Sequence, residues 1–440
     1  MKFSRNIYKD EVDFKALALQ SPEFAKHLKP NDQLDFSNPD SVRQLTKSLL
    51  ARDFGLKVDL PDDRLCPPVP NRLNYILWLQ DLIDTTGDDY RDDYDPDREV
   101  VGLDIGTGCC SIYPLLGCAQ RPRWKFIATD IDDKNINWSR RNVSQNGLES
   151  RIKIVKTEKT DPLIPLGTKF GVESLDFTMC NPPFYESQEE MIASAQAKER
   201  PPFSACTGAE VEMVTPGGEI AFVSEMIEES LKLRDRVKWY TTMFGKLSSV
   251  SVIVENLIEL GNRNYAVTEF VQGSKTRRWA VAWSWRDLRP TTSVARGITS
   301  FPKHLLPFPS EFTFHVSNNV IDAVGKKIDA EMRSLPLLQW HWRPGLASGI
   351  GFAMENVWSR QARRKRQKQK EQEQADPATT AQKMEEEVNE EKAALGFKIQ
   401  LKQDKAVEEG PTVVVRWLKG TDSVLFESFC GMLKRKVEEK

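Results

Sequence analysis

Along the middle of the chain, segments whose apolar residues suit a strand alternate with segments whose apolar residues recur with the period of a helix. Strand-like runs occur at Val100–Ile105, Lys125–Thr129, Ile152–Val155, Leu175–Cys180, Val237–Met243, Ala266–Gln272 and Arg278–Trp285. Helical patterns cover Cys110–Gln120, Lys134–Asn146, Ile220–Leu233 and Val250–Leu260. This alternation predicts an α/β fold with a doubly wound, mostly parallel, seven-stranded sheet. Because no helix separates the last two strands, we expect one of them to be an antiparallel addition at the sheet edge.

Weaker patterns precede this region. Residues 1–70 are rich in charged and turn-forming residues and contain an amphipathic helical stretch at Val42–Phe54. A further helix is expected at Asn74–Ile83, and the acidic stretch Asp84–Glu99 that follows is typical of an exposed loop. We therefore predict an N-terminal extension over residues 1–70 and an α/β domain over residues 71–290.

A second, smaller unit is predicted after Pro290. Its strand patterns lie at Glu311–Val316, Leu337–Trp342, Gly349–Met354, Phe397–Leu401 and Thr412–Leu418, and its helix patterns at Asn319–Arg333 and Ser423–Lys436. These indicate a small α+β module over residues 305–440, interrupted by a disordered charged insertion at about 361–393. The basic run Arg363-Arg364-Lys365-Arg366 fits a nuclear import signal and, equally, the basic half of a charged linker.

Composition and charge exclude several classes of protein. Seven cysteines without a C-x-x-C pair and four unclustered histidines predict no metal site. With no signal peptide and no apolar run of membrane length, we expect a reducing compartment and no membrane partner. The net charge is only −2, but basic residues outnumber acidic ones between Lys232 and Lys303. Such patches favour a selective nucleic-acid binder, although ordinary solvated faces are the common alternative.

Asn181-Pro182-Pro183-Phe184 is the most informative motif and directly follows the expected strand Leu175–Cys180. Two prolines stop the strand and fix the backbone at the carboxyl edge of the sheet, where open α/β sheets bind ligands. The Asn181 side-chain oxygen and the Pro182 carbonyl can each accept one hydrogen of an exocyclic amine, and Phe184 can stack on the ring. The amine lone pair would then point at an electrophile. The motif predicts amine methylation, with a core aromatic as the alternative role of Phe184.

A glycine-rich turn indicates where that electrophile binds. Gly106-Thr107-Gly108 follows the first strand, and Cys110 and Ser111 open the next helix. Asp130 ends the second strand, at a spacing that suits an acid for ribose hydroxyls. NAD, FAD and S-adenosylmethionine would all satisfy these features, and G-x-G alone is a weak signal. The Asn-Pro-Pro-Phe motif favours S-adenosylmethionine, because amine methylation needs a methyl donor rather than a hydride.

The stretch Tyr185–Pro216 separates this motif from the next helix. Its length is typical of a functional lid or of a disordered loop. It carries Lys198 and Arg200 before Pro201-Pro202, and a basic loop beside the pocket would suit closure over RNA. An unconstrained surface loop is the alternative.

Several separate stretches together identify a family. They are Tyr8-Lys9-Asp10 with Asp13-Phe14, LARDFGL at 50–56, VPNRLNYILWLQDLI at 69–83, LDIGTGCCSIYPLLG at 103–117, ATDIDD at 128–133, MCNPPF at 179–184 and TEFVQGSKTRRWAVAW at 268–283. Over about residues 5–288 the chain resembles the methyltransferase-like protein 16 family, the N6-adenosine methyltransferases of U6 small nuclear RNA, in a fungal-type form.

The resemblance implies a class I Rossmann-like core with S-adenosylmethionine as cofactor, S-adenosylhomocysteine as product, and an N-terminal RNA-binding extension. Family members methylate one adenosine in an ACAGAGA-like element of structured RNA, and in animals also hairpins of a methionine adenosyltransferase messenger. The implied partner is U6 RNA or a similar structured RNA and not DNA, with a role in pre-mRNA splicing in the nucleus and the cytoplasm as a second location. The C-terminal module looks like the family's second RNA-binding module, similar to a kinase-associated KA1 domain; a dimerisation or packing domain is the alternative.

The resemblance also implies roles for particular residues. The catalytic motif maps onto Asn181, Pro182, Pro183 and Phe184. The cofactor positions map onto Arg72, which would pair with the methionine carboxylate, and onto Gly106, Thr107, Gly108, Cys110, Ser111, Asp130, Thr160 and Asn181. RNA-binding positions map onto Arg200, Lys275 and Arg278.

This chain departs from the family pattern at several positions. The family often has Ser where this chain has Cys110, and Glu where it has Asp130. Asp161 competes with Thr160 for its assignment, and Glu199 replaces a basic residue in the lid. We expect these changes to alter the contacts of the lid more than those of the cofactor site.

Three other functions stay open at this point. One is a ribosomal RNA adenine-N6 methyltransferase that shares the Asn-Pro-Pro-Phe core, which methylation of U6 rather than ribosomal transcripts would exclude. Another is an RNA-binding splicing factor whose methylation is dispensable, which splicing rescue by an Asn181→Ala protein would support. A protein-glutamine methyltransferase is the third, and the local basic patches count against it.

Overall fold

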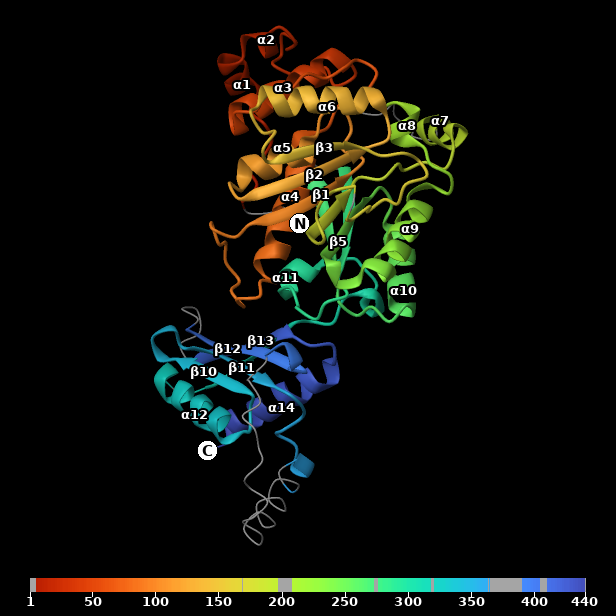
Figure 1. The fold of residues 1–440 in the computed structure, drawn as a ribbon. Coiled ribbons are helices and arrows are strands. Elements are labelled where there is room, and N and C mark those ends of the chain that lie inside the picture. The colour runs from red at the N-terminus through yellow and green to blue at the C-terminus, as the bar shows by residue number, and fades with distance from the viewer. Residues whose placement is uncertain are drawn as a thin grey trace. The chain divides into compact units, whose positions relative to one another are not determined.

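The computed structural model describes residues 5–167, 169–196, 208–272, 276–317, 320–362, 364, 390–403 and 410–439. They form two compact units (Figure 1). Unit 1 comprises described residues of Met1–Asp84, Asp93–Arg286 and Val294–Pro307; unit 2 comprises those of Thr85–Asp92, Asp287–Ser293 and Phe308–Lys440. The charged insertion expected at about 361–393 lies almost entirely outside the described residues, as does the basic run at 363–366 apart from Arg364.

Unit 1 is built around one sheet with the strand order β3-β2-β1-β4-β5-β7-β6-β8. The strands are β1 (Val100–Ile105), β2 (Trp124–Asp130), β3 (Ile152–Lys156), β4 (Leu175–Cys180), β5 (Val237–Phe244), β6 (Tyr265–Gln272), β7 (Thr276–Trp283) and β8 (Arg296–Gly297). From β3 to β5 every neighbouring pair in this order is parallel. The predicted α/β class and mostly parallel sheet are therefore confirmed.

Two details of the predicted sheet are wrong. The sheet has eight strands rather than seven, because β8 adds a two-residue pairing beside β6 that is too short to leave a pattern in the sequence. The antiparallel strand is β7, and it lies between β5 and β6 instead of at the edge. A short connection forces β6 and β7 to run in opposite directions, but pairing of β7 with both neighbours decides its interior position.

Helices cover both faces of this sheet because successive strand residues point to opposite sides. On β2, for example, Phe126 belongs to one core and Ile127 to the other. The first core includes residues of α4 (Val69–Asp84), α5 (Ile112–Gln120) and α6 (Asp133–Gln145). The second includes residues of α9 (Gly218–Leu233) and α10 (Leu247–Glu259), which lie together along one flank in Figure 1.

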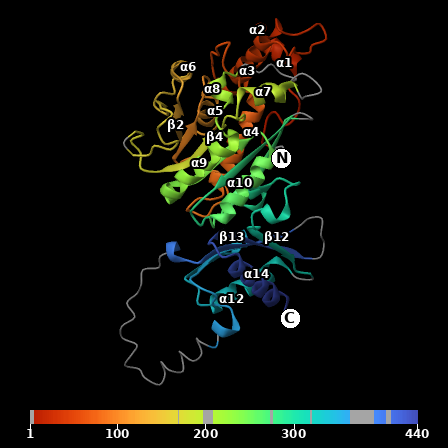
Figure 2. The same cartoon turned by 90° about the vertical axis from the view of Figure 1, so that its right-hand side faces the viewer.

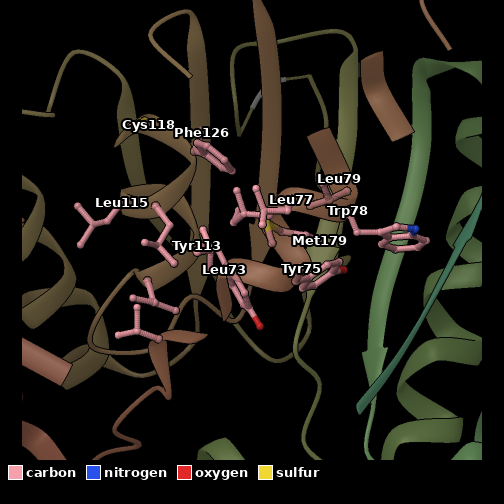
Figure 3. Close-up of a cluster of buried hydrophobic side chains, with 14 of the residues drawn as sticks. Leu73, Tyr75, Leu77, Trp78, Leu79, Tyr113, Leu115, Cys118, Phe126 and Met179 are labelled. Carbon is pink, nitrogen blue, oxygen red and sulfur yellow. The ribbon is translucent and has the colours of Figure 1, made fainter. Parts of the chain in front are cut away.

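Helix α4 is buried on nearly all sides: thirteen of its sixteen residues are buried, and nine of these are apolar. Its side chains Leu73, Tyr75 and Trp78 lie among Tyr113 and Met179 in the cluster of Figure 3. The Trp78 indole N–H donates to the Val294 carbonyl at 3.1 Å. Unit 1 therefore encloses the polar side chains Asn71, Arg72, Asn74 and Gln80 of α4.

The N-terminal part of unit 1 is helical: α1 (Phe14–Gln20), α2 (Pro22–Ala25) and α3 (Pro39–Phe54). Helix α3 contains the predicted helix Val42–Phe54. The Asn38 side chain caps its start by accepting from the N–H groups of Asp40 and Ser41, and Gly55, with φ of +66°, ends it. Other short helices are α7 (Gln188–Gln196), α8 (Glu210–Met213) and α11 (Thr292–Ala295), with 3-10 turns at Arg234–Arg236, Lys303–Leu305, Pro344–Leu346 and Glu390–Lys392.

Unit 2 has a five-stranded antiparallel sheet in the order β10-β11-β12-β13-β9. Its strands are β9 (Glu311–His315), β10 (Gln339–Arg343), β11 (Ser348–Ala353), β12 (Leu395–Gln403) and β13 (Pro411–Lys419). Helices α12 (Ile321–Ser334) and α14 (Ser423–Glu438) lie on one side of it (Figure 2). All five predicted strands and both predicted helices of this region are present.

Ser230 on α9 should stabilise unit 1 through a shared hydroxyl. Its Oγ accepts the indole N–H groups of Trp283 and Trp285, each at 3.0 Å, and donates to the Ile227 carbonyl at 2.7 Å. Ser230→Ala leaves the fully buried Trp283 N–H without an acceptor, so we expect the free energy of unfolding to fall by about 1–3 kcal/mol in urea titrations followed by tryptophan fluorescence.

Ser251→Ala on α10 is the control, because the Ser251 hydroxyl has no partner among the described residues. It should change the unfolding free energy by less than about 0.5 kcal/mol. Equal losses in the two variants would contradict the shared-hydroxyl interpretation.

Candidate active site

Three strand ends meet at the carboxyl edge of the unit 1 sheet. Strand β1 lies between β2 and β4, and Ile105 pairs with Thr129 on one side and Cys180 on the other. The chain winds outward from β1 to β3 and then returns to β4, so the strand order reverses here, which is where open α/β sheets bind ligands. The structure thus brings the predicted glycine turn, the predicted acid and the Asn-Pro-Pro-Phe motif to one place.

The glycine turn adopts backbone conformations that favour glycine. Gly106 and Gly108 have φ of +72° and +65°. No described heavy atom lies within 4 Å of the position that a Cβ on Gly106 would take, so that side of the turn is open. The Gly108 N–H donates to Asp130 Oδ2 and the Asp132 N–H to Asp130 Oδ1, each at 2.9 Å. Asp130 is thereby held along the turn in a position that fits a ribose diol.

Cys110 and Ser111 are buried behind the turn. Ser111 has φ of +51° and donates its hydroxyl to Ser139 Oγ at 2.9 Å, and Ser139 donates to the Gly108 carbonyl at 2.6 Å. Burial raises the pKa of the Cys110 thiol well above its usual value. Both side chains point into the protein interior. A ligand on the open side of the turn would therefore contact the backbone of these residues and not their side chains.

Asp104 on β1 is a candidate site residue that the sequence reasoning missed. It is fully buried, and neither carboxyl oxygen accepts a hydrogen bond from the described residues. Burial raises the pKa of Asp104 to about 7. The Thr107 hydroxyl is near enough to favour the ionised form of Asp104, but its geometry is not that of a hydrogen bond, so neither group has a hydrogen-bond partner among the described residues. Buried polar groups without partners are rare, and this pair fits a cationic N–H donor such as an α-ammonium group.

Arg72 connects the motif to the rest of the site. Its Nη1 donates to Asn181 Oδ1 at 3.0 Å and to the Tyr113 hydroxyl at 2.9 Å, and it lies 3.7 Å from the Met243 sulfur. The side chain is 7% exposed, and its Nε has no acceptor among the described residues. The predicted partner of Arg72 is a carboxylate of the ligand, and the unused Nε fits that partner.

The Phe184 ring lies close to the backbone at Gly245. A Cβ on Gly245 would come within 3.1 Å of Phe184 Cδ1 and 3.4 Å of Glu219 Oε2. The buried Glu219 carboxylate accepts the Gly245 N–H at 2.7 Å and the Lys246 N–H at 3.2 Å. This holds the backbone between β5 and α10 in the position that leaves room for the ring.

Arg278 is the one predicted RNA-binding residue that the structure describes. Its guanidinium lies over the Phe184 ring, 5.5 Å from the ring centroid, which is cation–π range. Burial lowers the pKa of Arg278. Arg200 and Lys275 lie outside the described residues. Of the three, Arg278 is therefore placed beside the motif.

Backbone pairing holds the chain that follows the two prolines. The Tyr185 N–H donates to the Met213 carbonyl at 3.0 Å, and the Thr215 N–H donates to the Tyr185 carbonyl at 2.9 Å. Both ends of the expected lid thus meet next to the motif. Glu212 accepts the Leu65 N–H at 2.9 Å, which ties the same stretch to the N-terminal region.

Thr160 lies in the turn after β3 and is exposed. Its rival Asp161 accepts the Glu158 N–H at 2.7 Å and pairs with Lys169, which lowers the pKa of Asp161. The buried Thr157, which was not predicted, donates its N–H to the Asp130 carbonyl at 3.0 Å. The structure therefore brings Thr157, more closely than Thr160, to the acid of the site.

The described part of the chain contains no group of three or more His, Cys, Asp or Glu residues placed to hold a metal ion. Within the same residues, no helix is long and apolar enough to cross a membrane.

Comparisons with known proteins agree with this arrangement. A family model described as an RNA methyltransferase matches residues 2–287. The chain is 35% identical over 417 residues to a U6 small nuclear RNA (adenine-(43)-N(6))-methyltransferase of Schizosaccharomyces pombe, covering 93% of this chain and 96% of that protein. It is 42% identical over 291 residues to the RNA N(6)-adenosine-methyltransferase METTL16 of Mus musculus, covering 64% of this chain and 51% of that protein. The chain thus spans almost all of the first relative and about half of the second.

Two solved structures resemble unit 1. The catalytic domain of hMettl16 in complex with MAT2A 3′UTR hairpin 1 is 40% identical, with a TM-score of 0.58, covering 64% of this chain and 95% of that one. The N-terminal domain of human METTL16 in complex with SAH is 40% identical, with a TM-score of 0.53, covering 64% of this chain and 98% of that one. The fold of the α/β unit is therefore that of the METTL16 methyltransferase domain.

Asp104→Asn should stabilise the ligand-free protein above neutral pH. Because burial raises the pKa of Asp104 from 3.8 to about 7, its contribution is favourable below pH 4 and is lost as the pH rises through 7. Asparagine cannot ionise, so the gain in unfolding free energy should grow from pH 5 to pH 8 and reach at most about 4 kcal/mol. Thermal unfolding at both pH values measures it.

The exposed Asp93→Asn is the matched control and should show no such pH dependence. A gain in Asp104→Asn that is equal at pH 5 and pH 8 would contradict an ionised, unpartnered carboxylate at neutral pH. The same variant should weaken binding of S-adenosylhomocysteine, measured by calorimetry.

Proposed function

We propose, from the premise that this chain belongs to the RNA methyltransferase family, that it transfers a methyl group from S-adenosylmethionine to N6 of one adenosine in U6 small nuclear RNA. The observation that carries the proposal is the juxtaposition of an amine-binding motif after β4 with a nucleoside-binding turn after β1. The relative matched along 93% of this chain is named for adenine methylation of that RNA. We propose the ACAGAGA-type element as the target and pre-mRNA splicing as the process it serves.

Asn181 is oriented for its proposed role by Arg72. An arginine side chain only donates, so the Asn181 oxygen and not its NH₂ must face Nη1, 3.0 Å away. A second lone pair on that oxygen remains for one hydrogen of the adenine amine, and the Pro182 carbonyl accepts the other. With both hydrogens held, the N6 lone pair is directed at the methyl group.

S-Adenosylmethionine would supply that methyl group in electrophilic form, bonded to a sulfonium. The N6–carbon bond forms as the sulfur–carbon bond breaks, and the resulting ammonium of the adenine releases its proton to water. This chain therefore needs no general base, and its contribution is positioning and a matched electrostatic pocket.

The residues around the glycine turn fit the cofactor. Asp130 would accept the ribose hydroxyls, and Arg72 Nε would donate to the methionine carboxylate. Asp104 would accept the α-ammonium group, because its carboxylate is buried without a donor. Gly106, Gly108 and the backbone at Cys110 and Ser111 would line the site, and Thr160 or Thr157 would lie on the adenine side.

Phe184 would stack on the adenine once the base has left its own stack. Unstacking costs a few kcal/mol, and least in loops of RNA. Arg278 lies over the same ring, 5.5 Å from its centroid, and we propose that it meets the phosphate of the nucleotide that enters. We propose Arg200 and Lys275 as further contacts to RNA.

We also propose roles for the parts outside the catalytic core. Residues 1–70 form an RNA-binding extension and residues 71–290 the methyltransferase domain. Residues 305–440 form a KA1-like module that binds RNA, supported by the antiparallel sheet backed by α12 and α14. The nucleus is the proposed location, because U6 small nuclear RNA is the proposed substrate.

Asn181→Ala should abolish methylation of U6 RNA. Mass spectrometry after incubation with labelled S-adenosylmethionine should find one methylated adenosine with the wild type and a loss of roughly a hundredfold or more in the variant. Asn137→Ala, on the exposed face of α6, is the matched control and should keep full activity. Label on ribosomal but not U6 RNA would overturn the proposed substrate, and undiminished label with Asn181→Ala would overturn the proposed role of the motif.

Gly245→Ala should slow the reaction by displacing Phe184. A Cβ only 3.1 Å from Phe184 Cδ1 forces the ring to move by a few tenths of an ångström. We expect kcat to fall roughly tenfold, with little change in the KM for S-adenosylmethionine. Gly431→Ala on α14 adds a Cβ into open space and is the control. A change confined to the KM for the cofactor would contradict this explanation.

A further inference from the structure

The acidic stretch between α4 and β1 is a sequence feature that the proposed reaction does not use. From Asp88 to Asp97 it contains six aspartates and one arginine. Its first part, Thr85–Asp92, belongs to unit 2 although both flanking elements belong to unit 1. This first part of the expected exposed loop therefore packs against the five-stranded sheet of unit 2.

The segment packs against the face of that sheet that α12 and α14 leave uncovered (Figure 2). On β12, Phe397, Ile399 and Leu401 belong to the core with the helices. Strand residues alternate between faces, so Lys398, Gln400 and Lys402 point to the other side, at a spacing of about 7 Å. Arg416 on β13 pairs with Lys398 in register and shares this face. The uncovered face therefore carries a row of basic and amide groups.

Three residues of the segment Thr85–Asp92 contact this face. Asp92 Oδ2 lies 3.1 Å from Lys398 Nζ, and Asp92 Oδ1 lies 3.9 Å from Arg416 Nε. The Thr85 carbonyl accepts from Arg416 Nη2 at 3.5 Å. The Tyr90 ring packs on Phe352 of β11, with centroids 5.0 Å apart. An acidic group and an aromatic ring thus occupy basic and apolar positions of one sheet face.

The segment Thr85–Asp92 leaves some polar groups at this sheet face without hydrogen-bond partners. Arg416 is almost fully buried, yet its Nε and the facing Asp92 Oδ1 each lack a hydrogen-bond partner among the described residues. Both line a cavity of about 230 Å³ together with Lys398, Gln400, Lys402 and Glu311. Tyr90 adopts φ of +56°, which is unfavourable for a non-glycine residue. A buried guanidinium with an unused donor in a polar cavity fits an anionic group that comes closer to Arg416 Nε than the Asp92 carboxylate, at 3.9 Å, does.

We propose that this sheet face binds the phosphates of RNA and that Thr85–Asp92 occupies it as an internal competitor. The inference rests on the proposed function, in which residues 305–440 bind the RNA, and it adds which face of the sheet does so and which segment of the chain competes for that face. The two non-bridging oxygens of a phosphodiester share one negative charge, and they can accept from Lys398 and Arg416 together. When Asp92 leaves, two lysines and an arginine face Glu311 alone, so the cavity gains positive charge for a polyanion.

The competition is weak enough to be reversed by RNA. The side chains of Lys398 and Asp92 are 22% and 29% exposed, and ion pairs with that access to water contribute about 1 kcal/mol or less. Removing the carboxylate should therefore raise the affinity for RNA by about two- to fivefold, rather than by orders of magnitude.

The test measures binding of fluorescein-labelled U6 RNA to the full chain by anisotropy, over a series of salt concentrations. Asp92→Asn should bind about two- to fivefold more tightly than the wild type. Asp93→Asn removes the same charge from the same loop at an exposed residue that has no hydrogen bond or ion pair among the described residues, and it should change binding less. Lys398→Gln and Lys402→Gln should each weaken binding and lower the slope of log affinity against log salt by about 1.

A double variant makes the test specific. If Asp92 acts mainly by covering Lys398, then Asp92→Asn should have a smaller effect in the presence of Lys398→Gln, because only Arg416 is then left for it to uncover. Equal gains in Asp92→Asn and Asp93→Asn, or unchanged affinity in both lysine variants, would overturn the inference. Lys402 is exposed and has no partner among the described residues, so its variant reports on binding even if Lys398→Gln perturbs folding.

The outcome is separable from that of the proposed function. Methylation of U6 RNA that persists while binding is insensitive to Asp92, Lys398 and Lys402 would overturn the inference alone. Binding that responds as expected, without any methyl transfer to U6, would overturn the proposed substrate and leave the RNA-binding face standing.

Discussion

A buried guanidinium holds the candidate active site together. Arg72 is 7% exposed, and it donates to Asn181 after β4 and to Tyr113 on α5. Removing a charge from water is costly unless its hydrogen bonds are made, so the acceptors must stand where the guanidinium needs them. Helix α4, helix α5 and the motif after β4 therefore cannot move independently without leaving that charge uncompensated. The orientation of the Asn181 amide follows from this constraint alone, because arginine offers no acceptor.

The position of Arg72 depends in turn on how α4 is packed. Tyr75, on the same helix, shares a hydrogen bond of 2.7 Å with Thr241 on β5, and its ring lies 5.8 Å from that of Phe270 on β6. Strands that are remote from the glycine turn thus set the helix that carries the central charge. A buried helix suits this role better than a loop, since close packing on every side leaves its polar group one position.

The sequence predicted most of the fold because its patterns are local. The apolar runs of β1 and β4 and the prolines after β4 are visible in a few residues, and the structure has both strands at these positions. The interior position of β7 and the pairing of β8 depend on contacts between distant segments, which no local period records. The same reason explains the site: Asp130 follows a strand and could be found, whereas Gly245 matters only because Phe184 lies beside it in space. Asp104 could have been noticed in the sequence, because it is the one acidic residue inside an apolar strand. Its lack of hydrogen-bond partners, however, can be seen only in the folded structure.

Each of the two units contains a buried arginine whose hydrogen-bonding capacity is only partly used. In each, a buried arginine donates some of its hydrogens to fixed acceptors and keeps Nε unused: Arg72 in unit 1 and Arg416 in unit 2. An unused donor on a buried cation is unfavourable for the protein alone, and it persists only where another group compensates it part of the time. In unit 1 the proposed compensating group is the methionine carboxylate, and in unit 2 it is an RNA phosphate. The carboxylate of Asp92, 3.9 Å from Arg416 Nε, is then a partial substitute that is close enough to reduce the cost and too distant to remove it.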